Sequence, residues 1–309
     1  MQPPTRWTIR SVKTAVSRRD ALLAAACIAS PALIRAKPVA PRSKATFSRS
    51  ILQAVQAISA TQLGRGYLRS SSFSRDLQFS GTKLAAKSPP YTMCVGAVFE
   101  VIVTALNMYV QQSGDSTPHL FLPVASWTRL RPFDLRGQIW LVERSECFGT
   151  AHALQKFGMG AQTDFASLEP GAFINLNRSN RTGHATVFLS YIDKEGRELG
   201  LHSDRVAGFK YFSSQGTQDS GGFGIRLAFF SDAGCPTLTG SQKRDCGVIR
   251  SNEPMLLNCG VMWHPRDWEK GKALEQLGRE AYHMQRGDTA DLMDGDYDSR
   301  YLNGRTIDD

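Results

Sequence analysis

Residues 168–193 read LEPGAFINLNRSNRTGHATVFLSYID, and this stretch decides the fold. Two runs rich in β-branched and aromatic residues, AFINLN and HATVFLSYID, flank a polar loop with a glycine, a pattern typical of neighbouring strands. Further short runs of the same kind follow at VAGFKYFSS (206–214) and GIRLAFF (224–230). The chain from residue 168 onward is therefore predicted to form an antiparallel meander.

The residues before this stretch have a helical pattern instead. Residues 47–63 place three apolar side chains at helical spacing, Ile51, Val55 and Ile58. Residues 95–114, VGAVFEVIVTALNMYVQQSG, are predicted as a long buried helix, and residues 147–158, CFGTAHALQKFG, as a short one ending in glycine. Helices followed by a meander predict an α+β domain.

The amino-terminal segment predicts export. Arg18 and Arg19 precede an apolar run from Ala21 to Ile34, and the predicted cleavage site follows Ala36. Consecutive arginines at this position indicate the twin-arginine route, and the mature protein is expected in the periplasm or secreted. The apolar run is shorter than the ~20 residues of a spanning helix, so no stable membrane insertion is expected after cleavage. A lipoprotein cut before Cys27 is the other interpretation.

Three segments are expected from these patterns: a signal peptide (1–36), a linker with one helix (37–90) and a catalytic domain with a C-terminal extension (91–309). Residues 1–36 carry six basic side chains and one acidic one, so the net charge of +9 falls to +4 without them. This charge is too small to indicate a nucleic-acid-binding protein. The sequence leaves the oligomeric state and the role of residues 240–309 open.

Cysteine content predicts one or two disulfides, because exported proteins meet an oxidising environment. Five cysteines follow the predicted signal peptide: Cys94, Cys147, Cys235, Cys246 and Cys259. Cys235 and Cys246 flank PTLTGSQKRD, a glycine-containing loop that could close on itself, and they form the first predicted bridge. Cys147 with Cys259 is the second, which leaves Cys94 as the remaining thiol.

Cys94 is the candidate nucleophile, since it lies where the loop SPPYTMC meets the long predicted helix. The positive end of a helix dipole lowers the pKa of a thiol and favours the thiolate. His184 opens a predicted strand after a glycine turn and is the candidate base. Gln215 on the next strand is the preferred residue to orient the imidazole, with Ser214 or His202 as alternatives. A packed core residue is the other interpretation of Cys94.

This layout resembles the NlpC-type cysteine peptidases and amidases of bacterial cell walls, which are papain-like. The matching segments are YTMCVGAVFEV (91–101) and residues 168–193, under half of the chain. The resemblance implies a papain-like core with the nucleophile helix packed on an antiparallel sheet, and Cys94 and His184 as the catalytic pair. The family carries an acidic residue and a serine beside its cysteine, where this chain has Met93 and Val95, and an insertion separates the two segments.

The function expected from the sequence is an exported cysteine hydrolase that cleaves an amide bond in peptidoglycan stem peptides through a thioester. A papain-fold acyltransferase and a non-catalytic cell-wall binding protein of the same fold are the alternatives. The chain has no HExxH, paired CxxC or GxSxG motif, so no metal site and no serine hydrolase are expected. No cofactor is expected.

Overall fold

The computed structural model describes residues 43–61, 63–128, 148–180, 182–230, 235–236, 238, 243–286 and 307–308. Every described residue belongs to one compact unit, Ser43–Asp309. The predicted signal peptide and its cleavage site therefore lie outside the described residues, as do Cys147 and the acidic segment at 288–298.

The helices predicted near residues 47–63, 95–114 and 147–158 form in the structure, and its other helices were not predicted. The described helices are α1 (Ser48–Ala60), α2 (Cys94–Ser113), α3 (Thr117–Phe121), α4 (Val124–Trp127), α6 (Thr150–Lys156) and α7 (Lys270–Arg286), with single 3₁₀ turns at Phe165–Ser167 and Pro265–Asp267. In α1 the three residues at helical spacing, Ile51, Val55 and Ile58, are all buried. The amphipathic pattern therefore correctly identifies the face that α1 packs against the core.

Helix α2 is the central helix of the fold. It ends where Gly114 adopts a left-handed conformation (φ 70°) and donates its N–H to the Val110 carbonyl, as C-terminal glycines commonly do. By length and composition α2 could also span a membrane, but most of it is buried inside the protein. Such burial is typical of the core helix of a globular domain.

One large sheet supports these helices. Its strands run in the order β3 (Gly160–Gln162), β10 (Leu257–Met262), β4 (Phe173–Asn177), β5 (Thr182–Ile192), β7 (Gly208–Gln215), β8 (Gly222–Phe229) and β9 (Arg244–Cys246). The short strands β6 (Glu198–Leu199) and β11 (Ile307–Asp308) both pair with β5. The hairpin β1 (Leu77–Phe79) and β2 (Thr82–Leu84) stands apart. The pairings are antiparallel except β8–β9 and β5–β11, so the predicted α+β class is confirmed.

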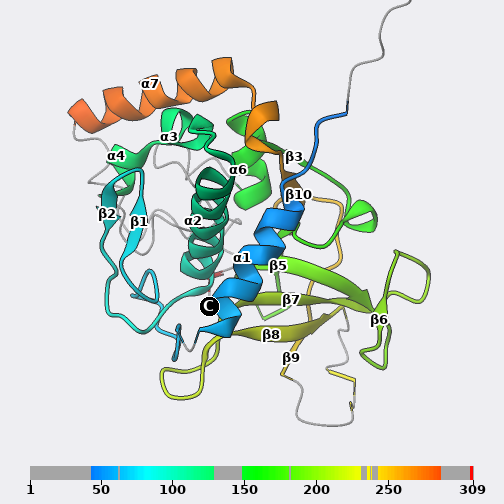
Figure 1. The fold of residues 1–309 in the computed structure, drawn as a ribbon. Coiled ribbons are helices and arrows are strands. Elements are labelled where there is room, and N and C mark those ends of the chain that lie inside the picture. The colour runs from blue at the N-terminus through cyan, green and yellow to red at the C-terminus, as the bar shows by residue number, and fades with distance from the viewer. Residues whose placement is uncertain are drawn as a thin grey trace, which may run out of the picture. The chain divides into compact units, whose positions relative to one another are not determined.

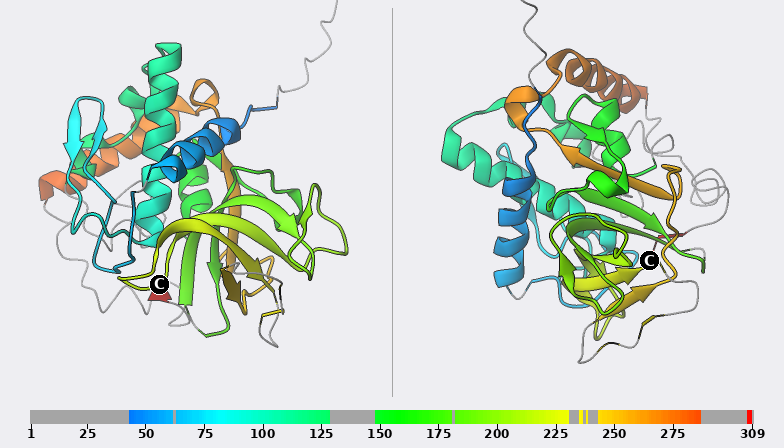
Figure 2. Two further views of the ribbon diagram at one scale, coloured as in Figure 1. Left: turned by 60° about the horizontal axis from the view of Figure 1, so that its bottom comes forward. Right: turned by 90° about the vertical axis from the view of Figure 1, so that its right-hand side faces the viewer.

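The sheet has a different core on each face, because side chains alternate along a strand. Ala185 and Val187 of β5 and Phe212 of β7 lie in one core, together with side chains of α1, α2 and α6. Phe188 of β5 and Tyr211 of β7 lie in the second core. Figures 1 and 2 show α1 and α2 on the same side of the sheet. We call this side the helix face and the other side the opposite face.

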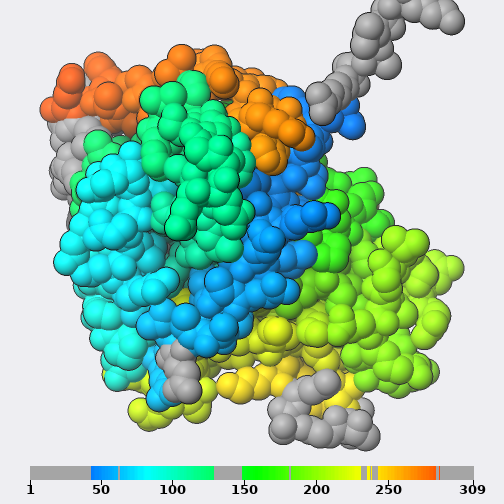
Figure 3. All heavy atoms as spheres, viewed as in Figure 1, coloured from blue at the N-terminus to red at the C-terminus, as the bar shows by residue number. Residues whose placement is uncertain are grey.

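Helix α1 forms part of the surface on the helix face. Figure 3 shows its blue atoms running diagonally between those of α2 and those of the strands.

A β-bulge between Phe188 and Ser190 changes the alternation within β5, so that Tyr191 joins Phe188 on the opposite face.

Candidate functional site

Cys94 is the first residue of α2 and lies on the helix face, within the core that contains Ala185. Its side chain is completely buried. The preceding residue, Met93, is extended, and Thr92 before it is held by a hydrogen bond from its hydroxyl to the Ser72 carbonyl (3.0 Å). The predicted position of this thiol at a helix N-terminus is confirmed, but the thiol is inside the protein rather than in an open groove.

His184 lies on the opposite face of the sheet. It precedes Ala185 in β5, so its side chain points away from α2. The imidazole packs edge-on against the Tyr211 ring, with the ring centroids 5.6 Å apart, and only 1% of the residue is exposed. The structure therefore does not bring Cys94 and His184 together. The two side chains are not in contact, so the expected direct proton transfer between them does not take place in this arrangement.

Gln215, the last residue of β7, is on the same face as His184 because it is four residues from Tyr211. Its Oε1 accepts hydrogen bonds from the Tyr211 hydroxyl (2.7 Å) and from Arg226 Nε (3.2 Å). Its main-chain oxygen accepts from Arg226 Nη2. Gln215 thus reaches His184 through Tyr211, whereas the prediction had Gln215 holding the imidazole directly.

The two alternatives for the orienting residue lie elsewhere. Ser214 faces the helices, where its hydroxyl is 3.5 Å from the Thr92 carbonyl. His202 packs against the rings of Phe165 and Tyr191. Neither side chain contacts His184 in the described part of the chain.

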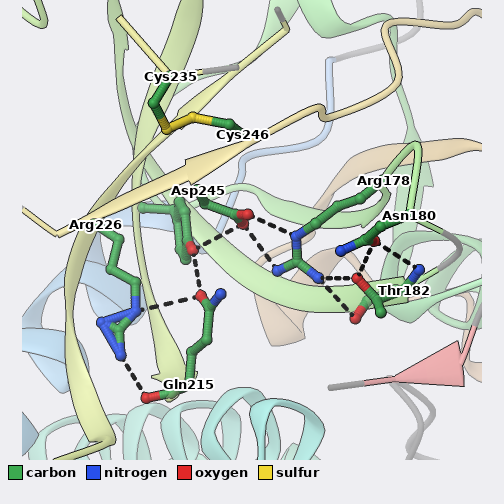
Figure 4. A network of polar contacts seen from close by, with 10 residues as sticks. Arg178, Asn180, Thr182, Gln215, Arg226, Cys235, Asp245 and Cys246 are labelled. Carbon is green, nitrogen blue, oxygen red and sulfur yellow. Dashed lines mark hydrogen bonds and ion pairs between the residues drawn. A yellow bond between two sulfur atoms is a disulfide. The ribbon is translucent and has the colours of Figure 1, made fainter. Parts of the chain in front are cut away.

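The network around His184 continues to a buried ion pair, shown in Figure 4. Arg178, which follows β4, donates from Nε and Nη2 to the two carboxylate oxygens of Asp245, at 2.6 and 2.8 Å. The Tyr211 hydroxyl lies 3.2 Å from the same carboxylate. Cys246, the next residue after Asp245, is bonded to Cys235, so the first predicted disulfide is confirmed.

Electrostatics keep the imidazole neutral. Burial lowers the pKa of His184 well below its usual value, and the nearby cations Arg178 and Arg226 lower it further. The pKa of the Tyr211 hydroxyl is raised well above its usual value by burial and then by the Asp245 charge. Both rings are therefore uncharged near neutral pH.

Three buried polar atoms in this cluster have no hydrogen-bond partner: Nδ1 and Nε2 of His184 and Nη1 of Arg226. Native proteins leave few such atoms unsatisfied, because each costs about 1–3 kcal/mol. An imidazole with neither nitrogen bonded is in addition able to accept a proton from an incoming group. We therefore take this cluster, which we call the His184 cluster, as the candidate site: Arg178, His184, Tyr211, Gln215, Arg226 and Asp245.

A second polar region surrounds Cys259 of β10. A pocket of about 180 Å³ is lined there by Asp164, Asn258 and Cys259, among others. Burial, and then the negative charge of Asp164, raise the pKa of the Cys259 thiol to about 12. Cys259 is a thiol and not half of a disulfide, so the second predicted bridge, to Cys147, is not formed.

Four members of the His184 cluster are missing from the sequence prediction. Tyr211 could have been found by alternation, because in KYFSSQG the residue four before Gln215 shares its face. Arg226 lies opposite Tyr211 in the β7–β8 register, which only the strand pairing reveals. Arg178 and Asp245 are 67 residues apart, and no local pattern links them.

No group of three or more metal-binding side chains occurs among the residues that the structure describes. Comparison of the chain with models of protein families, with curated proteins and with solved structures finds no match.

Proposed function

We propose that this protein is a cysteine-type amide hydrolase in which His184 is the general base. The observation that carries the proposal is the neutral imidazole of His184, buried and without a partner on either ring nitrogen. A base must hold a free lone pair at the working pH, and a depressed pKa provides it. Tyr211 and Gln215 act as positioning residues, because the hydroxyl of one is bonded to the amide of the other.

The nucleophile in this proposal follows by elimination. Cys235 and Cys246 are joined in a disulfide, and the pKa of Cys259 is about 12, far above that of a reactive thiol. Cys94 lies on the helix face, beyond the sheet from His184. Of the cysteines after residue 36, only Cys147 remains, and it lies outside the described residues. We propose Cys147 in place of Cys94 as the thiol that attacks.

In the proposed reaction, His184 takes the thiol proton as the thiolate attacks the amide carbonyl, and the protonated imidazole then gives that proton to the leaving amine. Water, activated by the same imidazole, hydrolyses the thioester and releases the acid. The resemblance to the NlpC-type enzymes in residues 168–193 supports peptidoglycan stem peptides as the first substrates to test and a papain-like core as the finer fold class. It also supports the expected export of the protein.

The test is a product assay on muropeptides with four single variants. Mass spectrometry should show amide cleavage by the unmodified protein and at least a 100-fold lower rate for Cys147→Ala and for His184→Ala. Cys94→Ala and Cys259→Ala serve as matched controls and should keep the rate. Full activity of Cys147→Ala would show that Cys147 is not the nucleophile. Adding amine acceptors distinguishes the acyltransferase, which would form a new amide instead of the free acid.

A second candidate function is non-catalytic binding to the cell wall. The observation that favours it is the separation of Cys94 and His184, both buried and on opposite faces of the sheet. Co-sedimentation with purified peptidoglycan tests this candidate. Binding without amide cleavage, with unchanged binding by His184→Ala, would favour it over the hydrolase.

A further inference from the structure

Arg226 is a buried cation that no carboxylate neutralises in the described part of the chain. Only 5% of the residue is exposed, and the hydrogen bonds from its Nε and Nη2 both go to Gln215, which is uncharged. Among the described residues, no Asp or Glu oxygen lies within ion-pair distance of its guanidinium. The nearest carboxylate in the cluster, Asp245, is already bonded at both oxygens by Arg178.

This arrangement is unusual on energetic grounds. Burying a charge without a partner costs several kcal/mol, and natural proteins avoid it unless the charge pairs with another group. Arg178 follows this rule and Arg226 does not. An anion bound at the unpartnered Nη1 of Arg226 would stabilise this buried charge.

His184 adds further unpartnered atoms in the same cluster. Tyr211 lies between the two residues: it is paired with Arg226 across β7 and β8, and its ring contacts the imidazole. A neutral imidazole carries one N–H donor and one lone pair. Its N–H and Nη1 of Arg226 together supply two donors and one positive charge, the set that a carboxylate accepts. The second ring nitrogen keeps its lone pair for the proton transfer proposed above.

The backbone near His184 also shows the position at which an extended ligand would pair. The ladder between β5 and β7 ends at Val187 and Phe212, and beyond it the Ser213 hydroxyl donates a hydrogen bond to the Ala185 carbonyl (2.6 Å). At Thr182 and Gly183 β5 pairs with β11, a two-residue strand that runs parallel to it. β11 therefore occupies the position of an added strand, and an extended peptide that binds by strand addition would replace it.

We propose that Arg226 and His184 form a binding site for a carboxylate group of the substrate, and that the substrate is an extended peptide with a free carboxylate. The identification of the ligand as the substrate rests on the proposed hydrolase function. The binding of a carboxylate does not depend on that function. Arg226 acts in this proposal as a specificity-determining residue.

The binding test uses two small probes that differ only in charge, N-acetylalanine and its neutral amide, with ionic strength held constant. ¹⁵N NMR of the histidine rings should show a saturable shift of the His184 signals with N-acetylalanine and none with the amide. Arg226→Gln should weaken the binding at least tenfold, and Arg226→Lys should weaken it less, because it keeps the charge. Arg197→Gln is the matched control, since Arg197 is exposed and already paired with Asp193 and Glu195.

Two outcomes overturn the inference. Equal or absent shifts with both probes would mean that water alone satisfies these atoms. Unchanged binding of N-acetylalanine by Arg226→Gln would mean that Arg226 does not hold the carboxylate. If the protein binds a carboxylate through Arg226 but cleaves no amide, the binding site is retained and the hydrolase function is rejected. If it cleaves substrates with a free carboxylate and with a neutral amide at equal rates, the hydrolase function is retained and the carboxylate site is rejected.

Discussion

Arg178 holds both carboxylate oxygens of Asp245, although the two residues are 67 positions apart in the chain. The pair joins the end of β4 to β9, the last strand in the order of the large sheet. Both side chains are almost completely buried, at 3% and 5% exposed. Each charge therefore stabilises the other in the interior.

Asp245→Asn should accordingly lower the free energy of unfolding by about 3–5 kcal/mol, because it removes the carboxylate that accepts two hydrogen bonds from the buried Arg178 guanidinium. Glu275→Gln is the control: it removes a carboxylate from an exposed pair with Arg279 and should cost no more than about 1 kcal/mol. Urea unfolding measures both. Equal small effects would mean that Arg178 finds another partner.

The disulfide next to Asp245 should also contribute to stability. Cys235 and Cys246 are 11 positions apart, and closing a loop of this length restricts the unfolded chain. This adds about 2–3 kcal/mol to the free energy of unfolding. The double variant Cys235→Ser with Cys246→Ser should lose about that amount. Non-reducing mass spectrometry of a proteolytic digest should find the two cysteines in linked peptides, and their recovery as separate peptides would contradict the bridge.

Gly96 in α2 should not tolerate a side chain. A Cβ atom there would lie 2.0 Å from the main-chain oxygen of Ser72, so the helix or its neighbour would have to move. Gly96→Ala should therefore destabilise the protein by about 1–3 kcal/mol. Gly278→Ala in α7 meets nothing within 4 Å and should instead stabilise by about 0.5–1 kcal/mol, since alanine favours helix. A thermal unfolding comparison gives the two signs directly.

Stability should fall as the pH drops below about 6.5, because the unfolded chain protonates its histidine there while folded His184 stays neutral. A histidine with a depressed folded pKa contributes stability above the unfolded pKa and loses it below. The slope from one such group is at most about 1.4 kcal/mol per pH unit. His184→Asn should flatten the curve between pH 6.5 and 5, whereas His264, whose pKa is also lowered, remains in both proteins. Identical curves would show that His184 titrates normally.

Cys94 should resist alkylation in the native protein, because none of its surface is exposed. Iodoacetamide at neutral pH should label it only after unfolding, and Cys259, which is 4% exposed and has a raised pKa, should behave in the same way. Peptide mapping by mass spectrometry checks both sites. Rapid labelling of native Cys94 would return it to candidacy as the nucleophile.

The elements that the sequence predicted well are those with strong local periodicity. Helix α2 and strands β4, β5, β7 and β8 carry long apolar or alternating runs, and they form close to the predicted residues. Strand β10 was missed, because LNCGVM has a single β-branched residue, Val261, and no aromatic one, although it pairs with both β3 and β4. Its formation depends on tertiary packing.

The candidate site was harder to predict than the fold, for a physical reason. Cys94 is the first residue of α2 and β5 begins at Thr182, two residues before His184, so the sequence placed the thiol correctly and the histidine almost correctly. It did not show which face of the sheet each side chain meets. That depends on strand register, which is fixed by the packing of Ala185 and Val187 against the helices.

Because side chains alternate along β5, a shift of one residue decides whether Ala185 or His184 faces the helices. Ala185 pairs with Asn175 of β4, whose Oδ1 accepts a hydrogen bond from Thr150 N at the start of α6. On β7, the neighbouring strand on the other side of β5, the Ser214 hydroxyl lies 3.5 Å from the Thr92 carbonyl just before α2. Two helices thus begin above the place that Ala185 occupies. Gain of one residue between β4 and His184 would shift the strand by one step and place the imidazole where Ala185 now lies. A single codon insertion would in this way move His184 from the opposite face to the side on which both helices start.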